Sequence, residues 1–185
     1  MRFVTRLMLA ATFALGAATP GLAQNVKYVG GAAMYPQKNI VENAVNSKDH
    51  TTLVAAVKAA GLVDTLMTPG PFTVFAPTNA AFNKLPPGTV ATLVKPENKA
   101  MLTSILTYHV VSGLYTSADL MKLIKQGGGE AKLKTVNGET LSVLPGRSGK
   151  SLFIADAKGH TSRITIANVM QSNGVIHVVN TVVTP

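Results

Sequence analysis

The change in hydrophobic periodicity along the chain places the strongest constraint on its fold. Apolar residues recur at helical spacing over most of the range from Asn39 to about Thr107, which a compact apolar strand at 72–76 interrupts. They do so again from Ser117, a candidate cap, to about Lys125. From Ala131 onward they alternate instead, as half-buried strands require. Helices therefore come mainly first and strands mainly last, which predicts an α+β domain with an antiparallel sheet.

Three dipeptides that end in glycine separate the apolar segments of the strand-rich half: Asn137-Gly138, Lys158-Gly159 and Asn173-Gly174. An Asn-Gly pair favours a two-residue type I′ turn, in which both central residues have positive φ. The sequence therefore predicts successive hairpins. Their strands are expected at 131–136, 140–144, 151–155, 161–169 and 175–183.

Capping and breaking residues delimit the predicted helices. Asn39 suits an N-cap, and Gly61 should end a second helix that begins near Thr51. Pro96 suits the first turn of a later helix that runs to about Thr107. The inward face of that later helix is predicted to consist of Met101, Leu102, Ile105 and Leu106.

Residues 1–23 have the features of a secretory signal peptide. Arg2 and Arg6 give a positively charged start, and the apolar run 7–18 that follows is too short to span a bilayer. Small residues before Gln24 indicate cleavage near Ala23. We therefore expect a secreted or periplasmic protein without a membrane span.

The rest of the chain has the length of one ordinary domain. Residues 24–38 are rich in glycine, alanine and turn formers, and we expect them to form a loosely packed N-terminal arm before a domain at 39–185. There is no cysteine, so the fold uses no disulfide. The net charge of +9 includes Arg2 and Arg6, and falls to +7 without them. Because the lysines are dispersed and tryptophan is absent, we do not expect nucleic acid as a partner.

Three segments, in this order, resemble the signatures of the fasciclin domain family: TVFAPTNAAF (73–82), LTYHVVSG (106–113) and NGVIHVVNTVVTP (173–185). The resemblance extends over about 39–185 and is to bacterial secreted single-domain members. It implies a wedge-shaped antiparallel β-sandwich with several short helices packed along one edge. It also implies a role in adhesion or another extracellular interaction rather than in catalysis.

The resemblance marks a set of motif residues with either structural or recognition roles. They are Thr73, Val74, Phe75, Ala76, Pro77, Thr78, Asn79, Phe82, Tyr108, His109, Asn173, Gly174, His177 and Asn180. Family members often carry acidic residues where this chain has Ala80, Asn168 and Asn180. An amide keeps hydrogen-bonding capacity but has no charge, so a charge-dependent role of those acids does not transfer to this chain.

The polar motif residues each allow two interpretations. Thr78 or Asn79 should cap the short helix that follows, with a contact role as the alternative. Tyr108 and His109 either satisfy hydrogen bonds within the fold or recognise a partner. As neighbours near a strand, they are not expected to be equally buried. His177 is either a surface partner of the sheet or a polar plug at its margin.

Neither a metal site nor an active site is evident. The four histidines show no H-x-H or i,i+4 spacing, and thiolate ligands are absent, so we expect no metal and no cofactor. The segment Gly149-Lys150-Ser151 imitates the end of a phosphate-binding loop, but Leu144 stands where that motif needs its first glycine. The acidic residues are scattered, and we therefore expect no enzymatic activity.

Three functions remain open, in decreasing order of support. The first is an exported, non-catalytic interaction or adhesion module of the cell envelope or extracellular matrix. Such a module would bind a protein or polysaccharide as a monomer or weak oligomer. The second is a carrier of a small ligand or lipid in an apolar cleft, and the third is a hydrolase whose residues meet only in space.

Overall fold

The computed structural model describes residues 26–185, so the predicted signal peptide and its cleavage site near Ala23 lie outside the described residues. The fold is built on a seven-stranded sheet in the order β4-β3-β9-β8-β7-β6-β5. Its strands are β3 (Phe72–Pro77), β4 (Val110–Ser112), β5 (Ala131–Lys134), β6 (Thr140–Pro145), β7 (Leu152–Ala155), β8 (Thr161–Gln171) and β9 (Gly174–Val179). The predicted α+β class is confirmed.

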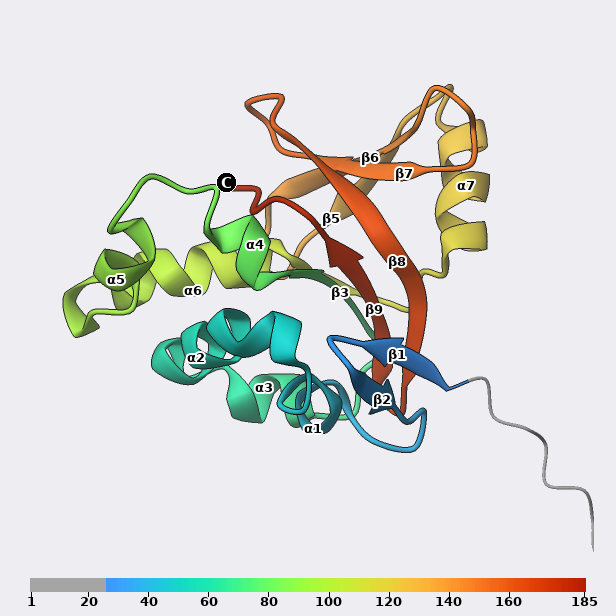
Figure 1. Cartoon of the computed structure of the whole chain (residues 1–185). Helices are drawn as coiled ribbons and strands as arrows, with labels where there is room; N and C mark the ends of the chain where they lie inside the picture. The colour runs from blue at the N-terminus through green and yellow to red at the C-terminus, as the bar shows by residue number, and fades with distance from the viewer. Residues whose placement is uncertain (1–25) are drawn as a thin grey trace, which may run out of the picture.

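The central pair β3 and β9 is parallel, with Phe72 opposite Gly174, whereas the other neighbours in the sheet are antiparallel. The two outer strands also approach each other. Val111 forms a bridge with Thr135, and the amide of Val136 donates to the carbonyl of Val110 at 2.8 Å. The sheet therefore curls toward closure, and its strongly bent form is visible in Figure 1.

The helices fall into two groups (Figure 1). They are α1 (Ile40–Ala44), α2 (Thr51–Ala60), α3 (Val63–Met67), α4 (Asn79–Phe82), α5 (Thr89–Leu93), α6 (Lys99–Tyr108) and α7 (Ser117–Gln126), with 3₁₀ turns η1 (Lys48–His50) and η2 (Pro96–Asn98). Helices α1 to α6 lie together on one side of β3 and β9. Helix α7 lies apart from them, against β5 and β6.

Helix boundaries follow the capping chemistry of the sequence. Asn39 forms a capping box with Glu42, and Gly61 ends α2 in the left-handed conformation at φ 72°, so both predicted positions are confirmed. The predicted cap Ser117 is wrong by one residue. Thr116 has the extended backbone of an N-cap, and its hydroxyl accepts the amide of Asp119, whose carboxylate accepts the amide of Thr116 in return.

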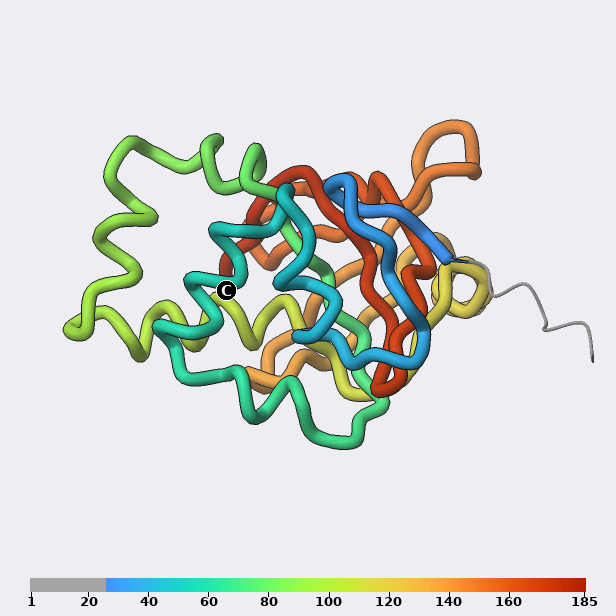
Figure 2. Tube along the Cα trace, turned by 60° about the horizontal axis from the view of Figure 1, so that its bottom comes forward, coloured from blue at the N-terminus to red at the C-terminus, as the bar shows by residue number. Residues whose placement is uncertain are grey.

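The segment before α1 is not a loose arm, contrary to expectation. It forms an antiparallel hairpin of β1 (Lys27–Val29) and β2 (Ala32–Met34), and it buries Val29 and Met34 in the core. The Lys27 ammonium also donates to the carbonyl of Ala167 in β8. Figure 2 shows this hairpin, in blue, lying along the red C-terminal strands. Its two strands are too short for an alternation of apolar and polar residues to predict the hairpin from the sequence.

Two apolar cores flank the central strands. Val74 and Ile176 point into a core shared with α1 to α6, whereas Phe75 and Val179 point into a second core closed by α7 and the curled sheet. All six residues of β9 are buried for this reason. A strand that is covered on both faces shows no polar alternation, as the sequence of β9 illustrates.

Two predictions about side-chain placement and turn type are wrong. Met101 was expected to face inward from α6 but is 58% exposed, because Leu102 and Leu106 already fill the contact with the core. At the first hairpin turn, Gly138 has φ 91° but Asn137 does not share a positive φ. The amide of Gly138 donates to Thr135, which gives a three-residue loop rather than a type I′ turn.

Candidate functional site

The tyrosine-histidine segment lies where α6 ends. Tyr108 is the last residue of α6 and His109 is its C-cap, and both side chains are buried, with exposures of 0% and 2%. The expectation that the two are unequally buried is therefore wrong. It assumed alternation along a strand, whereas these residues end a helix between two cores.

Both ring nitrogens of His109 are used within the fold. Nδ1 donates to the carbonyl of Ile105 at 2.8 Å, so Nε2 carries no proton and accepts the amide of Val183 at 3.3 Å. Burial lowers the pKa of His109 to about 4, although the Ile105 carbonyl acts in the opposite direction. The imidazole is therefore neutral near pH 7 and has no free nitrogen for proton transfer.

The hydroxyl of Tyr108 donates to the carbonyl of Thr140 at 2.9 Å, which ties α6 to the start of β6. Burial raises the pKa of Tyr108, and the nearby charges of Asp156 and Glu139 raise it further. The phenol therefore stays protonated at ordinary pH. Together with His109, it fixes this junction to two other parts of the chain.

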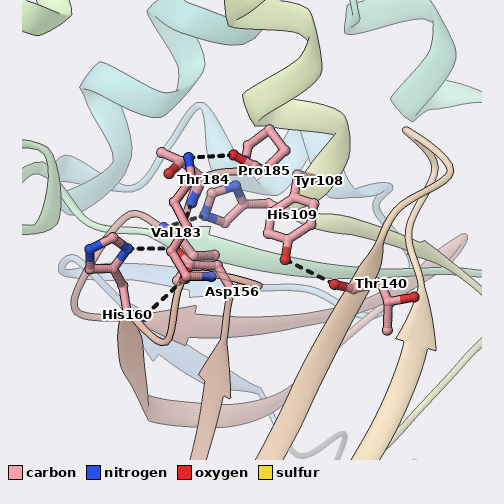
Figure 3. A network of polar contacts seen from close by, with 9 residues as sticks. Tyr108, His109, Thr140, Asp156, His160, Val183, Thr184 and Pro185 are labelled. Atoms are coloured by element: carbon pink, nitrogen blue, oxygen red, sulfur yellow. Dashed lines mark hydrogen bonds and ion pairs between the residues drawn. The ribbon is translucent and has the colours of Figure 1, made fainter.

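Asp156 organises a neighbouring polar network (Figure 3). One of its oxygens accepts the amides of Lys158 and His160, each at 2.9 Å. The other pairs with Nδ1 of His160 at 2.9 Å and accepts the amide of Thr184 at 3.4 Å. Burial would raise the pKa of Asp156, but the hydrogen bonds from His160 and Thr184 outweigh it and keep this pKa below its ordinary value.

Sequence reasoning did not single out Asp156, although a signal was present. Asp at the first position of a four-residue turn, with glycine at the fourth, is typical of type I turns. Asp156 and Gly159 occupy those positions, and the amide of Gly159 donates to the Asp156 carbonyl at 3.1 Å. What the sequence could not show is that this turn also holds Thr184.

His177 is fully buried on β9, so it is not a surface residue. Its Nε2 donates to the carbonyl of Tyr115 at 2.8 Å, and its Nδ1 accepts the amide of Asn168 at 3.4 Å. The ring stacks on Phe75 with centroids 5.7 Å apart. Burial lowers the pKa of His177, which keeps this ring neutral as well.

Thr78 and Asn79 cap two different helices. The Thr78 hydroxyl accepts the amide of Ala81 at 3.2 Å and caps α4, as predicted. The side chain of Asn79 instead reaches back to the start of α2. It accepts the amide of Thr52 at 2.9 Å and donates to the carbonyl of Lys48 at 2.9 Å, so Thr78 is the one of the two candidates that caps α4.

The asparagine side chains of the closing motif, Asn173 and Asn180, also link distant segments. The Asn173 side chain accepts the amide of Ile40 at 3.0 Å, which joins β9 to the start of α1. Its Nδ2 donates to the carbonyls of Leu66 and Thr68, at 2.8 and 3.0 Å. Asn180 is only partly buried, and its side chain accepts the amide of Arg163 at 3.0 Å.

Gly174 is required by close packing of backbones. A Cβ at this position would overlap the carbonyl oxygen of Phe72 in β3. The Thr73 hydroxyl donates to the carbonyl of Gly113 at 2.7 Å and accepts the amide of Tyr115 at 2.9 Å. The remaining motif residues are buried side chains of β3 and α4: Val74, Phe75, Ala76, Pro77 and Phe82.

The motif residues therefore surround the central β3–β9 pair, and some of them line an apolar pocket between the helices and the sheet: Val74, Phe75, Ala76 and His109. His109 and His177 make separate sets of hydrogen bonds, to Ile105 and Val183 in one case and to Tyr115 and Asn168 in the other. Within residues 26–185, no three histidine or acidic side chains lie close enough to hold a metal ion. Over the same range, none of the helices has the length and apolar character needed to cross a membrane.

Comparison with known proteins gives a consistent result. The Fasciclin domain family model matches residues 48–185. Protein sll1483 of Synechocystis sp. is 44% identical over 180 residues, which cover 94% of this chain and 91% of that protein. The cell surface glycolipoprotein MPB83 of Mycobacterium bovis is 32% identical over 168 residues, covering 88% of this chain and 68% of that protein.

Among solved structures, the chain is similar to a FAS1 domain pair from the insect cell adhesion molecule Fasciclin I, with a TM-score of 0.71 and 21% identity. The match covers 80% of this chain but 51% of that chain, so the protein spans about half of the solved pair. The likeness shows that the fold described above is the fold of such a domain.

Proposed function

The chain belongs to the fasciclin domain family, and on this premise we propose that it is an exported, non-catalytic adhesion module. Its partner is a protein or polysaccharide of the cell surface or matrix. The predicted signal peptide supports export, and the cell-surface relative in Mycobacterium bovis supports the location. The insect adhesion molecule with the same fold supports the kind of function.

One observation carries the proposal: the polar motif side chains are occupied inside the fold. His109 and His177 are buried and use both ring nitrogens, and Asn173 uses its amide for three hydrogen bonds. Side chains whose hydrogen-bonding atoms are already paired inside the fold cannot also bind a substrate or transfer its protons. Partner binding is therefore left to the exterior surface, where a stable protein–protein interface typically buries roughly 1,200–2,000 Å².

Adhesion by a single small domain is expected to be weak and to depend on multiple copies. We therefore test it with the mature chain, residues 24–185, displayed on beads at low and high density. The beads are offered to intact cells of the source organism and to their isolated matrix. We expect retention that rises more steeply than the number of displayed copies, and protease or periodate treatment of the cells then distinguishes a protein from a polysaccharide partner.

Electrostatic background is controlled with salt. At an ionic strength of about 1 M the Debye length is roughly 3 Å, so attraction due only to net positive charge is lost. A Tyr108→Phe variant is the structural control, because it removes the bond to Thr140 without changing the exterior. Binding per folded molecule should be unchanged in this variant. If bead retention disappears at high salt, or Tyr108→Phe abolishes it in folded protein, the proposal is wrong.

A further inference from the structure

The β1–β2 hairpin presents two tyrosine side chains to solvent. Its inner face buries Val29 and Met34, and alternation along the strands places Tyr28 and Tyr35 on the opposite face. Tyr28 is 70% exposed, the highest value for any large apolar or aromatic side chain of residues 26–185, and Tyr35 is 45% exposed. Single exposed apolar residues are ordinary, but two aromatic rings on one face indicate a binding surface, where tyrosine is enriched.

The two tyrosines are neighbours across the hairpin. Tyr28 lies opposite Ala33, and Tyr35 is two residues beyond Ala33. Diagonal neighbours of this kind are about 7–8 Å apart, which is within reach of aromatic side chains. The residue between them, Ala33, contributes only a methyl group. We call Tyr28, Ala33 and Tyr35 the tyrosine face.

The backbone beneath the tyrosine face is held by the rest of the fold. The amide of Tyr35 donates to Oδ1 of Asn43 at 3.0 Å, and Nδ2 of Asn43 donates to the carbonyl of Tyr35 at 2.8 Å. Asn43 is itself fully buried. In the hairpin turn, the carbonyl of Gly30 accepts the amide of Lys48 at 3.2 Å. A ligand therefore has to order little beyond the tyrosine rings, which have only two rotatable side-chain angles each.

A cation lies beside the two rings. The Lys38 ammonium is 5.5 Å from the centroid of the Tyr35 ring, which is a cation–π distance. The Glu42 carboxylate accepts the amide of Asn39 at 2.8 Å in the capping box. Within residues 26–185, the one ion pair of 4.0 Å or less is at Asp156, far from this hairpin in sequence. The charge of Lys38 is therefore not paired with a carboxylate of the described chain.

We propose that the tyrosine face binds an acidic polysaccharide, a partner within the adhesion function proposed above, on which this inference rests. A sugar ring stacks on Tyr28, and a carboxylate of the polymer pairs with Lys38, which Tyr35 holds in place. One face of a sugar ring exposes C–H groups, which match the negative face of an aromatic ring. The ammonium adds a charge-assisted hydrogen bond to the carboxylate.

The small size of the tyrosine face favours a polysaccharide over a protein. An aromatic side chain buries about 150–250 Å² when fully covered, so the exposed parts of Tyr28 and Tyr35 together offer on the order of 200 Å². A stable protein interface buries roughly 800 Å² on each partner. A polysaccharide needs only a narrow contact, and its repeating units allow several copies of the domain to bind one polymer chain.

Binding is tested by NMR titration of the mature chain with three soluble polymers. Polygalacturonate has sugar rings and carboxylates, its methyl ester has the rings without the charge, and poly-L-glutamate has the charge without the rings. Polygalacturonate should shift the ring signals of Tyr28 and Tyr35 and the methyl signal of Ala33. The ester should bind about two- to fivefold more weakly, as expected for the loss of one exposed ion pair. Poly-L-glutamate should leave the Tyr28 signals unchanged.

Variants assign the surface. Tyr28→Ala should weaken polygalacturonate binding by about two- to tenfold, the range of one aromatic contact, whereas Tyr28→Phe should keep the affinity. Because the Tyr28 side chain is mostly exposed, its removal should not affect folding. Lys38→Gln should remove the preference for polygalacturonate over its ester. Met101→Ala and Lys125→Gln alter an exposed apolar and an exposed basic residue of other elements, and should change neither property.

Three results would contradict the proposal. Equal shifts of the Tyr28 signals by poly-L-glutamate and by polygalacturonate would show attraction by charge alone. No response to polygalacturonate, or an unchanged affinity in Tyr28→Ala, would show that the tyrosine face is not the binding surface.

The bead assay described above separates this inference from the adhesion function. If the unaltered chain and Tyr28→Ala are retained equally on cells, adhesion is supported and the tyrosine face is not its surface. If the unaltered chain is not retained, the adhesion function itself is wrong. If Tyr28→Ala lowers a retention that protease removes and periodate does not, the partner is a protein and the polysaccharide proposal is wrong.

Discussion

His109 and His177 act as hydrogen-bonding partners for the backbone at the centre of this molecule. Each ring donates to one carbonyl and accepts one amide, so each joins two segments that are distant in sequence. Both must be neutral to do so, because a protonated imidazole has no acceptor. Their neutral state is therefore linked to the stability of the fold.

Stability should fall as the pH drops from 6.5 to 4. The pKa of His109 is 6.5 in the unfolded chain and about 4 in the folded one, so in this window the unfolded state takes up a proton first. This group alone lowers the free energy of unfolding by on the order of 3 kcal/mol across the window. The pKa values of His50 and His177 are lowered too, and act in the same direction. Urea unfolding at a series of pH values measures the sum.

A His109→Gln variant should show a shallower pH slope, because one titrating group is gone. Tyr108→Phe is the adjacent control, since it also removes a buried hydrogen bond but no group that titrates between pH 4 and 6.5. It should lower stability equally at every pH in the window. Asp156 does not interfere, because its lowered pKa places the loss of its contribution below pH 3.8. An unchanged slope in His109→Gln would refute the assignment.

Local capping chemistry could be predicted from the sequence residue by residue, but partners distant in sequence could not. Asn39 and Thr78 were identified correctly because an N-cap bonds to its own helix. The bonds that Asn79 makes at the start of α2 could not be predicted, because its partners, Thr52 and Lys48, lie well before it in the chain. The burial of Tyr108 beside His109 depended likewise on two cores that only the folded chain forms.

At the scale of secondary-structure elements, the parallel contact between β3 and β9 holds the fold together. It brings the first motif against the last and separates the two cores. The contact is close enough at Phe72 to exclude any side chain from Gly174. Added side-chain volume between these two strands should therefore destabilise the fold more than the same addition at a hairpin turn of the sheet.

Gly174→Ala should lower the free energy of unfolding by about 3 kcal/mol or more, because the new Cβ overlaps the backbone of β3. Chemical denaturation at neutral pH measures the effect. Gly138→Ala is the matched control, since its Cβ would meet open space and the cost arises only from a positive φ of 91°. That cost is about 1–2 kcal/mol. A smaller loss for Gly174→Ala than for Gly138→Ala would contradict the proposed close contact.

The positions of the elements were easier to predict than their pairing. Periodicity and turn residues located the hairpins of the second half, because both signals are local. The turn at Gly138 was assigned the wrong type, since Asn-Gly alone does not fix the number of loop residues. The parallel pairing was missed because β3 and β9 are joined through nearly the whole domain, and no local pattern records such a contact.

At the scale of the whole molecule, the last residues of the sequence are part of the core. Val182 and Val183 are buried, and the amide of Val183 binds Nε2 of His109. The next amide, of Thr184, binds Asp156 in the turn between β7 and β8 (Figure 3). The end of the sequence therefore connects the helical side of the domain to the curled part of the sheet.

Removal of residues 182–185 should consequently destabilise the entire domain rather than fray one end. Burying two valine side chains contributes about 3–6 kcal/mol, a large part of the 5–15 kcal/mol typical of a folded domain. The loss also leaves the buried Nε2 of His109 without its donor. Pro185→Ala is the control, because it keeps the carbonyl that accepts the Lys158 ammonium at 2.8 Å and should change stability by less than about 0.5 kcal/mol. Thermal and urea unfolding of the shortened chain, followed by circular dichroism and by hydrogen exchange of β3, should show a single earlier transition. If instead the shortened chain unfolds within about 1 kcal/mol of the full one, the terminal segment only covers a core that is already complete.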